Sequence, residues 1–159
     1  MPLTWIEITL RLVLSMVLGG FIGWEREVEG KPAGLRTLML VSLGAAIFVL
    51  AGINASLQAG EPIDALRAMS GVAEGVGFLG AGLIFRTRRT VHLLTTAAAV
   101  WAAAGVGVAV GLGQYYMAIL ASALVFVTLR FFDRLEQRML QQGKSKDSGE
   151  KKGDGSDAG

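Results

Sequence analysis

A carboxyl group lies near the middle of a long apolar stretch of the sequence. Glu74 falls in the run 65–85 and has apolar neighbours on both sides. A charge at the centre of a bilayer costs about 2.5 to 3.5 kcal/mol on insertion scales, so this carboxyl is expected to stay protonated or to bind a cation. One hypothesis is an ion or proton site at Glu74, and the alternative is a neutral carboxyl that hydrogen-bonds a neighbouring helix. Candidate partners for that hydrogen bond are Asn54, Ser70, Thr95 and Thr96.

Charged residues also gather where the apolar runs begin and end. Around the first connection these residues are Glu25, Arg26, Glu27, Glu29 and Arg36. The loop between them holds Pro and Gly, which favour tight turns, so a Glu25–Arg36 ion pair that joins two helix ends is one hypothesis. A solvated interfacial patch is the default interpretation, and direct catalysis or ligand binding is the third. Further along, the spacing of Asp64 and Arg67 fits an i,i+3 pair on one helix, which indicates a structural role.

Enzyme chemistry finds little support in the sequence. The stretch 75–80 matches G-x-G-x-x-G, but a dinucleotide site needs a preceding strand and an acidic residue about 20 positions on. Here the preceding stretch is helical in pattern, and Trp101 stands near that position. With no Cys and one His, thiolate chemistry and a multi-His metal site within one chain are excluded. A Ser-His-Asp set and a P-loop are also missing, so we expect a protein that is not an enzyme.

Five apolar runs carry these residues. Of the 159 residues, 52% are hydrophobic and 18% are charged, whereas a soluble domain has about 25% charged residues. A transmembrane helix needs about 20 mainly apolar residues. The runs show no alternation of apolar and polar residues with period 2, which favours helices over a barrel. We therefore predict an all-α, polytopic membrane helix bundle. Its spans are Trp5–Trp24, Leu38–Leu57, Ala65–Phe85, Leu93–Leu112 and Tyr115–Phe132.

Positive charge alternates between the connections of these spans. Lys and Arg concentrate in the first and third connections and after the fifth span, and the fourth connection has neither. The positive-inside rule then predicts five spans with the N-terminus outside and the C-terminus inside. Residues 1–140 are expected to form the membrane domain. Residues 141–159 lack large apolar side chains and are expected to form a disordered cytoplasmic tail.

Small residues recur at four-residue spacing in three of the runs. Such spacing lets helix backbones approach closely, which drives packing inside a bilayer. Whether these faces meet within one subunit or between two is left open by the sequence. Five glycines between positions 71 and 82 also suggest a break in the third helix, since each costs about 1 kcal/mol against Ala. The residues of interest are Ser15, Gly19, Gly23, Gly71, Gly75, Gly77, Gly80, Gly82, Gly107 and Gly111.

Three motifs occur in a fixed order between about residues 10 and 130. They are GGFIGWEREVEGKPAGLRTLMLVSLGAAIF, GVGFLGAGLIF and LTTAAAVWAAAGVGVAVGLG. Together they closely resemble the membrane domain of the MgtC/SapB family. The family pattern G-x-E-R-E followed by G-L-R-T is met by residues 23–27 and 34–37, and its D-x-x-R by Asp64 and Arg67. Residues 75–82 match G-I-G-F-L-G-A-G with Val76 for Ile. Residues 93–98 match the family's G-L-T-T-A-A, except that Leu93 replaces its Gly.

The resemblance implies a multi-pass protein of the bacterial inner membrane that is linked to growth in low magnesium and, in pathogens, to survival inside macrophages. It implies a regulator that binds another membrane protein, such as the F-type ATP synthase or a P-type cation pump. The alternative is a Mg²⁺ or proton transporter that uses Glu74. We expect no cofactor, and Mg²⁺ is the candidate metal ion. The expected partners are the lipid bilayer and a second copy in a homodimer, and no nucleic acid, since the net charge is only +2. Many members carry a soluble C-terminal domain of ACT-like type, and we expect the short polar tail of residues 141–159 to stand in its place here.

Overall fold

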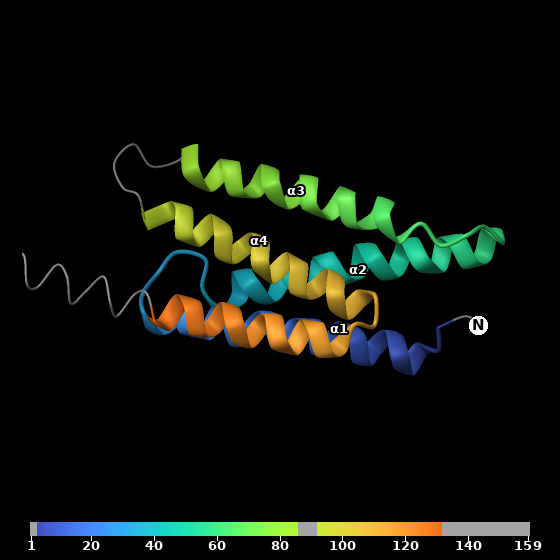
Figure 1. Ribbon diagram of the computed structural model, residues 1–159, viewed down its shortest axis with the longest axis horizontal. Coiled ribbons are helices and arrows are strands. Elements are labelled where there is room, and N and C mark those ends of the chain that lie inside the picture. The colour runs from blue at the N-terminus through green and yellow to red at the C-terminus, as the bar shows by residue number, and fades with distance from the viewer. Residues whose placement is uncertain (1–2, 86–91, 132–159) are drawn as a thin grey trace, which may run out of the picture. The chain divides into compact units, whose positions relative to one another are not determined.

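All regular structure in the described part of the chain is helical. The computed structural model describes residues 3–85 and 92–131. These residues form helices α1 (Trp5–Val28), α2 (Leu35–Ala59), α3 (Ala65–Phe85), α4 (His92–Gly111) and a fifth helix, Tyr115–Phe131 (Figure 1). The predicted all-α class is therefore confirmed. The predicted tail, 141–159, and the arginine-rich connection 86–91 lie outside the described residues.

The helices have the length and composition of membrane spans. Helices α1 and α2 and the stretch Leu94–Gly111 of α4 are each long and apolar enough to cross a bilayer. Helix α3 has 21 residues and includes Arg67 and Glu74, and the fifth helix is apolar but shorter. The direction in which the chain crosses the membrane stays a prediction.

The chain divides into two units, residues 1–126 and 127–159. The packing described below lies within the first unit. Of the second, the structure describes residues 127–131, which continue the fifth helix.

Local capping fixes where the helices begin and end. At the start of α1, the Thr4 hydroxyl accepts from the Glu7 N–H at 3.3 Å, and the Glu7 carboxylate accepts from the Thr4 N–H at 2.9 Å. This is a capping box. Helix α2 is followed by the C-cap Gly60, whose φ of 69° is left-handed and suits Gly. At α3, the Asp64 carboxylate accepts from the Arg67 N–H at 3.0 Å, so Asp64 contacts the backbone of Arg67 as an N-cap.

Glycines bring α1 into close contact with α2. A Cβ atom on Gly19 would lie 2.5 Å from the Leu38 carbonyl oxygen, and one on Gly23 would lie 2.8 Å from the Leu35 Cα. Real Cβ atoms do not come that close to backbone atoms, so both positions require Gly. Ser15, one turn before Gly19, is fully buried. The small-residue face of the first helix therefore meets α2 of the same chain.

Glycines of α4 also approach α2 closely. A Cβ atom on Gly107 would run into the Ser42 carbonyl oxygen, and one on Gly111 would lie 2.9 Å from the Val49 Cβ. Helices α1, α2 and α4 thus pack against one another in a core with little space between backbones. Because lipid cancels the hydrophobic effect between helices, this close van der Waals packing is what stabilises the bundle.

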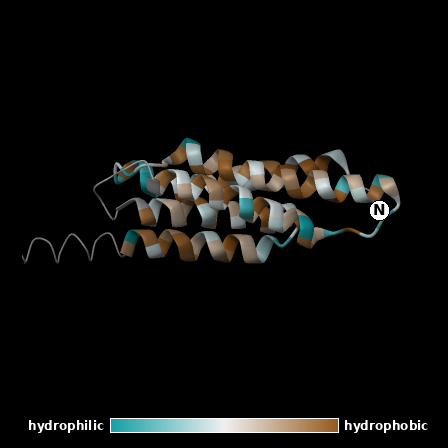
Figure 2. Cartoon of the chain, turned by 90° about the horizontal axis from the view of Figure 1, so that it is seen from above, coloured by the Kyte–Doolittle hydropathy of each residue, from teal (hydrophilic) through white to brown (hydrophobic). Residues whose placement is uncertain are grey.

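Apolar side chains cover much of the outer surface. Helix α1 exposes a stripe at helical spacing, and hydrophobic residues recur along every helix in Figure 2. The exposed residues of this stripe are Ile6, Leu10, Val13, Val17, Phe21, Trp24 and Val28. Phe21 stacks on Phe126 of the fifth helix at 4.4 Å between ring centroids. An exposed apolar surface of this extent is expected of a protein surrounded by lipid.

Helix α3 is continuous through its glycine cluster. Residues 65–85 form one α-helix, so the suggested break between positions 71 and 82 is wrong. A break would leave several backbone groups without hydrogen bonds, each at several kcal/mol in an apolar medium, whereas each Gly costs only about 1 kcal/mol. The helix packs against α4, where a Cβ on Gly80 would lie 3.7 Å from the Ala97 Cβ.

Candidate functional site

Two charged side chains are buried near the end of α1. Arg26 is 1% exposed and Glu25 is 2% exposed. The Arg26 Nη2 donates to the Thr96 hydroxyl of α4 at 2.8 Å, in a bond between two buried groups. The default interpretation of this segment as a solvated patch therefore does not hold for Glu25 and Arg26. Buried charges are stable only where hydrogen bonds and counter-charges surround them, so this end of α1 is a built polar site.

Glu27 connects the ends of α1 and α2. Its Oε2 accepts from the Leu35 N–H at 3.0 Å, and a Cβ on Gly34 would run into the same oxygen. The N-cap Gly34 has no side chain with which to cap α2, so a carboxylate from the preceding helix does so. The sequence predicted that a Glu25–Arg36 pair joins the ends of α1 and α2. The structure shows a link between these helix ends that is made by Glu27. Arg36 is exposed.

The opposite end of α4 is bonded by Arg11, a residue that was not among those predicted from the sequence. The Arg11 Nη1 donates to the Gly111 carbonyl oxygen at 2.8 Å, and its guanidinium carbon lies 5.8 Å from the Tyr115 ring centroid. The last carbonyls of a helix have no partners within the helix, and a cation complements the dipole at that end. The presence of an Arg inside an apolar run is the sequence signal that could have indicated this contact.

A hydroxyl pair lies between these two sites. The buried Ser42 donates from its hydroxyl to the Ser15 carbonyl oxygen at 2.8 Å. Ser15 donates to the Leu12 carbonyl oxygen at the same distance. The Ser42–Ser15 bond joins α1 and α2 beside Gly19, where the helices are too close for larger side chains, and the Ser15–Leu12 bond lies within α1. The polar contacts of α1 thus recur along its whole buried face.

Glu74 and its candidate partners are not brought together. Thr96 is fully buried and bonds Arg26, whereas Glu74, Thr95 and Ser70 are exposed and Asn54 is half-buried. Among residues 3–85 and 92–131, the Glu74 carboxyl has no hydrogen-bond partner. It lies on the side of α3 away from the buried Val72 and Val76. The structure therefore places Glu74 where lipid or another protein would contact it.

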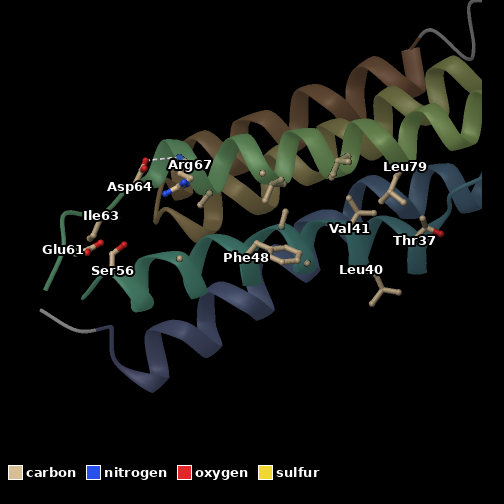
Figure 3. Close-up of a pocket in the computed structure, with 18 of the residues that line it drawn as sticks. Thr37, Leu40, Val41, Phe48, Ser56, Glu61, Ile63, Asp64, Arg67 and Leu79 are labelled. Carbon is tan, nitrogen blue, oxygen red and sulfur yellow. Dashed lines mark hydrogen bonds between the residues drawn. The ribbon is translucent and has the colours of Figure 1, made fainter. Parts of the chain in front are cut away.

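A long groove separates α2 from α3. Its volume is about 1410 Å³, and Figure 3 shows it running between the two helices. Thr37 and Arg36 line one end, and Asp64 and Arg67 line the other. The wall between these ends is mainly apolar, and Glu74 does not line it. In the described part of the chain, no group of three acidic or His side chains comes together as a metal site.

Sequence comparison places this arrangement in a known group. The model of the MgtC family matches residues 12–138. The chain belongs to the MgtC family. This match includes Arg26, Thr96, the groove and the exposed face of α3, so the features described above lie within the family domain. No solved structure matches the chain.

Several relatives share most of the chain. SrpB of Synechococcus elongatus is 41% identical over 143 residues, which cover 84% of this chain and 79% of SrpB. MgtC of Salmonella typhimurium is 39% identical over 132 residues, 83% of this chain and 55% of MgtC. The protein named "Putative magnesium transporter YhiD" of Escherichia coli is 36% identical over 140 residues, 86% of this chain and 65% of YhiD. The chain thus spans little more than half of MgtC and about two thirds of YhiD.

Proposed function

We propose that this protein is a regulator of another membrane protein of the bacterial inner membrane, and that it acts in adaptation to low magnesium. The F-type ATP synthase and a P-type cation pump are the candidate targets. Membership of the MgtC family supports the link to magnesium. The observation that supports a regulatory role is the exposure of Glu74 on an unpacked side of α3. A polar group at membrane depth is expected to contact protein. We further propose that the protein is a homodimer.

A Mg²⁺ or proton transporter is the second candidate, and the name of the relative YhiD favours it. Transport through one chain needs polar groups along a continuous path. The groove between α2 and α3 has charged residues at its ends and a mainly apolar wall between them. Glu74 lies outside that groove. A transport path that uses Glu74 would therefore run between subunits, where several copies of the carboxyl could gather.

Two assays on the same variants distinguish the candidates. The purified full chain, its Glu74→Gln variant and a Thr95→Val control are reconstituted in proteoliposomes with Mg²⁺-sensitive and pH-sensitive dyes. In parallel, ATP-driven proton pumping is measured in inverted membrane vesicles that contain each protein. A regulator of the synthase gives no flux in liposomes but lowers pumping, and Glu74→Gln relieves that effect while Thr95→Val does not.

The opposite pattern would overturn the proposal. Flux that disappears in Glu74→Gln and persists in Thr95→Val would establish transport. Unchanged pumping with all three proteins would exclude the ATP synthase, and the same comparison with Mg²⁺ uptake by the P-type pump would then test the second target. No effect in either system would refute the proposal that this protein regulates the ATP synthase or the P-type pump.

A further inference from the structure

The groove between α2 and α3 takes no part in the function proposed above. Its volume of about 1410 Å³ exceeds the range of about 300 to 1,000 Å³ that is usual for pockets that bury a drug-sized ligand. A Cβ atom on Gly44 of α2, or on Gly71 or Gly75 of α3, would meet nothing within 4 Å. All three glycines line the groove. The groove therefore has free space along its length that no side chain of either helix fills.

The two helices come close together at one point of the groove. A Cβ atom on Gly52 of α2 would lie 3.5 Å from the Cβ of Ala68 on α3. About two turns earlier in α2, the glycine at position 44 already has open space. Arg36 and Thr37 line the end of the groove beyond it. An elongated molecule would therefore enter at Arg36 and extend toward Gly52.

The side of the groove is open to the surrounding lipid. Leu40 and Phe48 of α2 and Leu79 of α3 line the groove (Figure 3) and are exposed. Large exposed apolar side chains on a membrane-spanning bundle contact the hydrocarbon of the bilayer. The wall between the two ends of the groove is mainly apolar as well. The middle of the groove is therefore suited to an acyl chain that enters from the bilayer.

The length of the groove fits one leaflet of a bilayer. Arg36 and Gly52 are 16 positions apart in α2, which corresponds to about 24 Å at 1.5 Å per residue. The acyl chains of one leaflet cover half of a hydrocarbon core of about 30 Å, or about 15 Å. One chain therefore fits between Gly52 and the basic end, with room for the glycerol and phosphate. A third helix, about 10 to 12 Å wide, would have to leave the groove where Gly52 approaches Ala68.

A cation stands at the entrance of the groove. Arg36 is exposed, and within the described part of the chain its guanidinium has no hydrogen bond or ion pair. The acidic residues that line the groove, Glu61 and Asp64, lie at the other end, and Glu27 does not line it. A guanidinium binds phosphate in a bidentate manner. The positive-inside rule predicts that this end faces the cytoplasm, where basic pockets between membrane helices bind anionic head groups.

We propose that the groove between α2 and α3 binds one anionic phospholipid, with its phosphate on Arg36 and one acyl chain along the apolar wall toward Gly52. The Thr37 hydroxyl, at the same end of the groove, can donate to a phosphate oxygen. The lipid site does not involve Glu74, so it holds whether the protein regulates a partner or transports an ion. The bound chain fills the space at the groove glycines that the protein itself leaves open.

Recognition of the head group is tested by native mass spectrometry of the full chain in a neutral detergent. Phosphatidylglycerol and phosphatidylcholine with the same acyl chains are added separately, so the ratio of their affinities reports on the anionic charge. Arg36→Gln should lower the affinity for phosphatidylglycerol about fivefold, the contribution of one basic side chain near anionic lipid, and leave phosphatidylcholine unchanged. Lys31→Gln is the control, because Lys31 belongs to the same connection and does not line the groove. It should change neither affinity by more than about twofold.

A second pair of variants tests the position of the acyl chain. Gly44→Leu places a side chain in the open space of the groove, and Gly77→Leu does so on α3 outside the groove. Neither new side chain meets a neighbour at its Cβ, so the thermal unfolding midpoints of both variants in lipid-free detergent should match that of the wild type. Gly44→Leu should lower the affinity for both lipids about tenfold or more, and Gly77→Leu should not.

A photoreactive lipid locates the site without any substitution. Phosphatidylglycerol with a diazirine on its acyl chain is activated in phosphatidylcholine vesicles that contain the protein, and the labelled peptides are identified. A small fraction of unlabelled phosphatidylglycerol should suppress labelling of residues 37–48 and 71–79, because a bound lipid is replaced at its site. Labelling of the apolar stripe on α1 should persist, because that surface contacts the bulk bilayer.

Several results would overturn the proposal. Equal affinities for the two lipids, or equal losses in Arg36→Gln and Lys31→Gln, would exclude recognition at Arg36. Displacement of the lipid by glycerol phosphate alone would show a site for free phosphate. Unchanged lipid binding in Gly44→Leu, with loss of the effect on ATP-driven pumping, would assign the groove to a helix of the target protein. Labelling that persists along the groove would show ordinary bilayer contact.

The same mass spectra also test the homodimer proposed above. A particle with the mass of two copies supports the dimer, and a particle of one copy refutes it. The lipid affinities are read from whichever particle is present. Failure of the dimer, of the lipid site and of the regulatory role can therefore be distinguished.

Discussion

The bond between Arg26 and Thr96 allows a sharp test of the polar site. Replacing Thr96 by Val keeps nearly the same shape and removes only the hydroxyl that accepts from Arg26 at 2.8 Å. Thr96 is fully buried, so water cannot replace the lost acceptor. Thr95 is the matched control, because it is the same residue type, adjacent in sequence and exposed.

The expected magnitude follows from the charge and burial of the donor. A hydrogen bond to a charged group contributes about 1.5 to 3 kcal/mol in soluble proteins, while polar bonds between membrane helices average about 0.6 kcal/mol with a maximum near 1.7. Arg26 has a further interaction besides Thr96, which retains part of its stabilisation. We therefore expect Thr96→Val to lower the free energy of unfolding by about 1 to 2 kcal/mol and Thr95→Val to change it by less than about 0.5.

The measurement is reversible unfolding of the purified protein in mixed micelles, followed by helical circular dichroism against the fraction of denaturing detergent. Both variants and the wild type are measured at one protein concentration. Equal stabilities for Thr96→Val and Thr95→Val would refute the argument that this buried bond stabilises the bundle. A greater loss in Thr95→Val would show that the exposed hydroxyl has an unrecognised partner.

Three further predictions concern the close contacts of the bundle. Gly107→Ala should lower the free energy of unfolding of the bundle by about 1 to 3 kcal/mol, because the new Cβ runs into the Ser42 carbonyl. The control Gly105→Ala in the same helix meets open space. In the same micelle titration it should be neutral or stabilising by up to about 1 kcal/mol. Glu27→Ala removes the carboxylate that caps α2 and should cost about 1 kcal/mol, with faster amide hydrogen exchange confined to the first turn of α2. Arg11→Met keeps much of the side-chain length but loses the bond to the Gly111 carbonyl, and should lower the thermal midpoint and increase proteolysis at residues 112–114.

The helices could be predicted from the sequence because each depends on its own residues. Apolar runs of sufficient length mark the spans, and the structure extends the first of them one turn, to Val28. The charged residues at its end explain this difference. The predicted span ends at Trp24 because the charged Glu25 and Arg26 follow it, but both residues are buried within the helix and Arg26 bonds Thr96 of α4.

The pairing of side chains could not be predicted in the same way. Glu25 and Glu27 have the same chemistry and differ by two positions, so only the packed structure assigns the cap of α2 to Glu27. Similarly, the glycines of α1, α3 and α4 share one spacing, yet α3 alone among them leaves that spacing open. Which faces meet depends on contacts between distant segments, and spacing within one helix does not contain that information.

The contact between Arg11 and Gly111 also has a consequence for biosynthesis. The two residues are separated by 100 positions, and chains are synthesised at about 5 to 20 residues per second. The guanidinium therefore enters the insertion machinery about 5 to 20 seconds before its acceptor exists. Thr96 likewise follows Arg26 after 70 positions. Helix α1 is thus made before two of its arginines have their α4 acceptors, and the arrival of α4 supplies a carbonyl to Arg11 and a hydroxyl to Arg26.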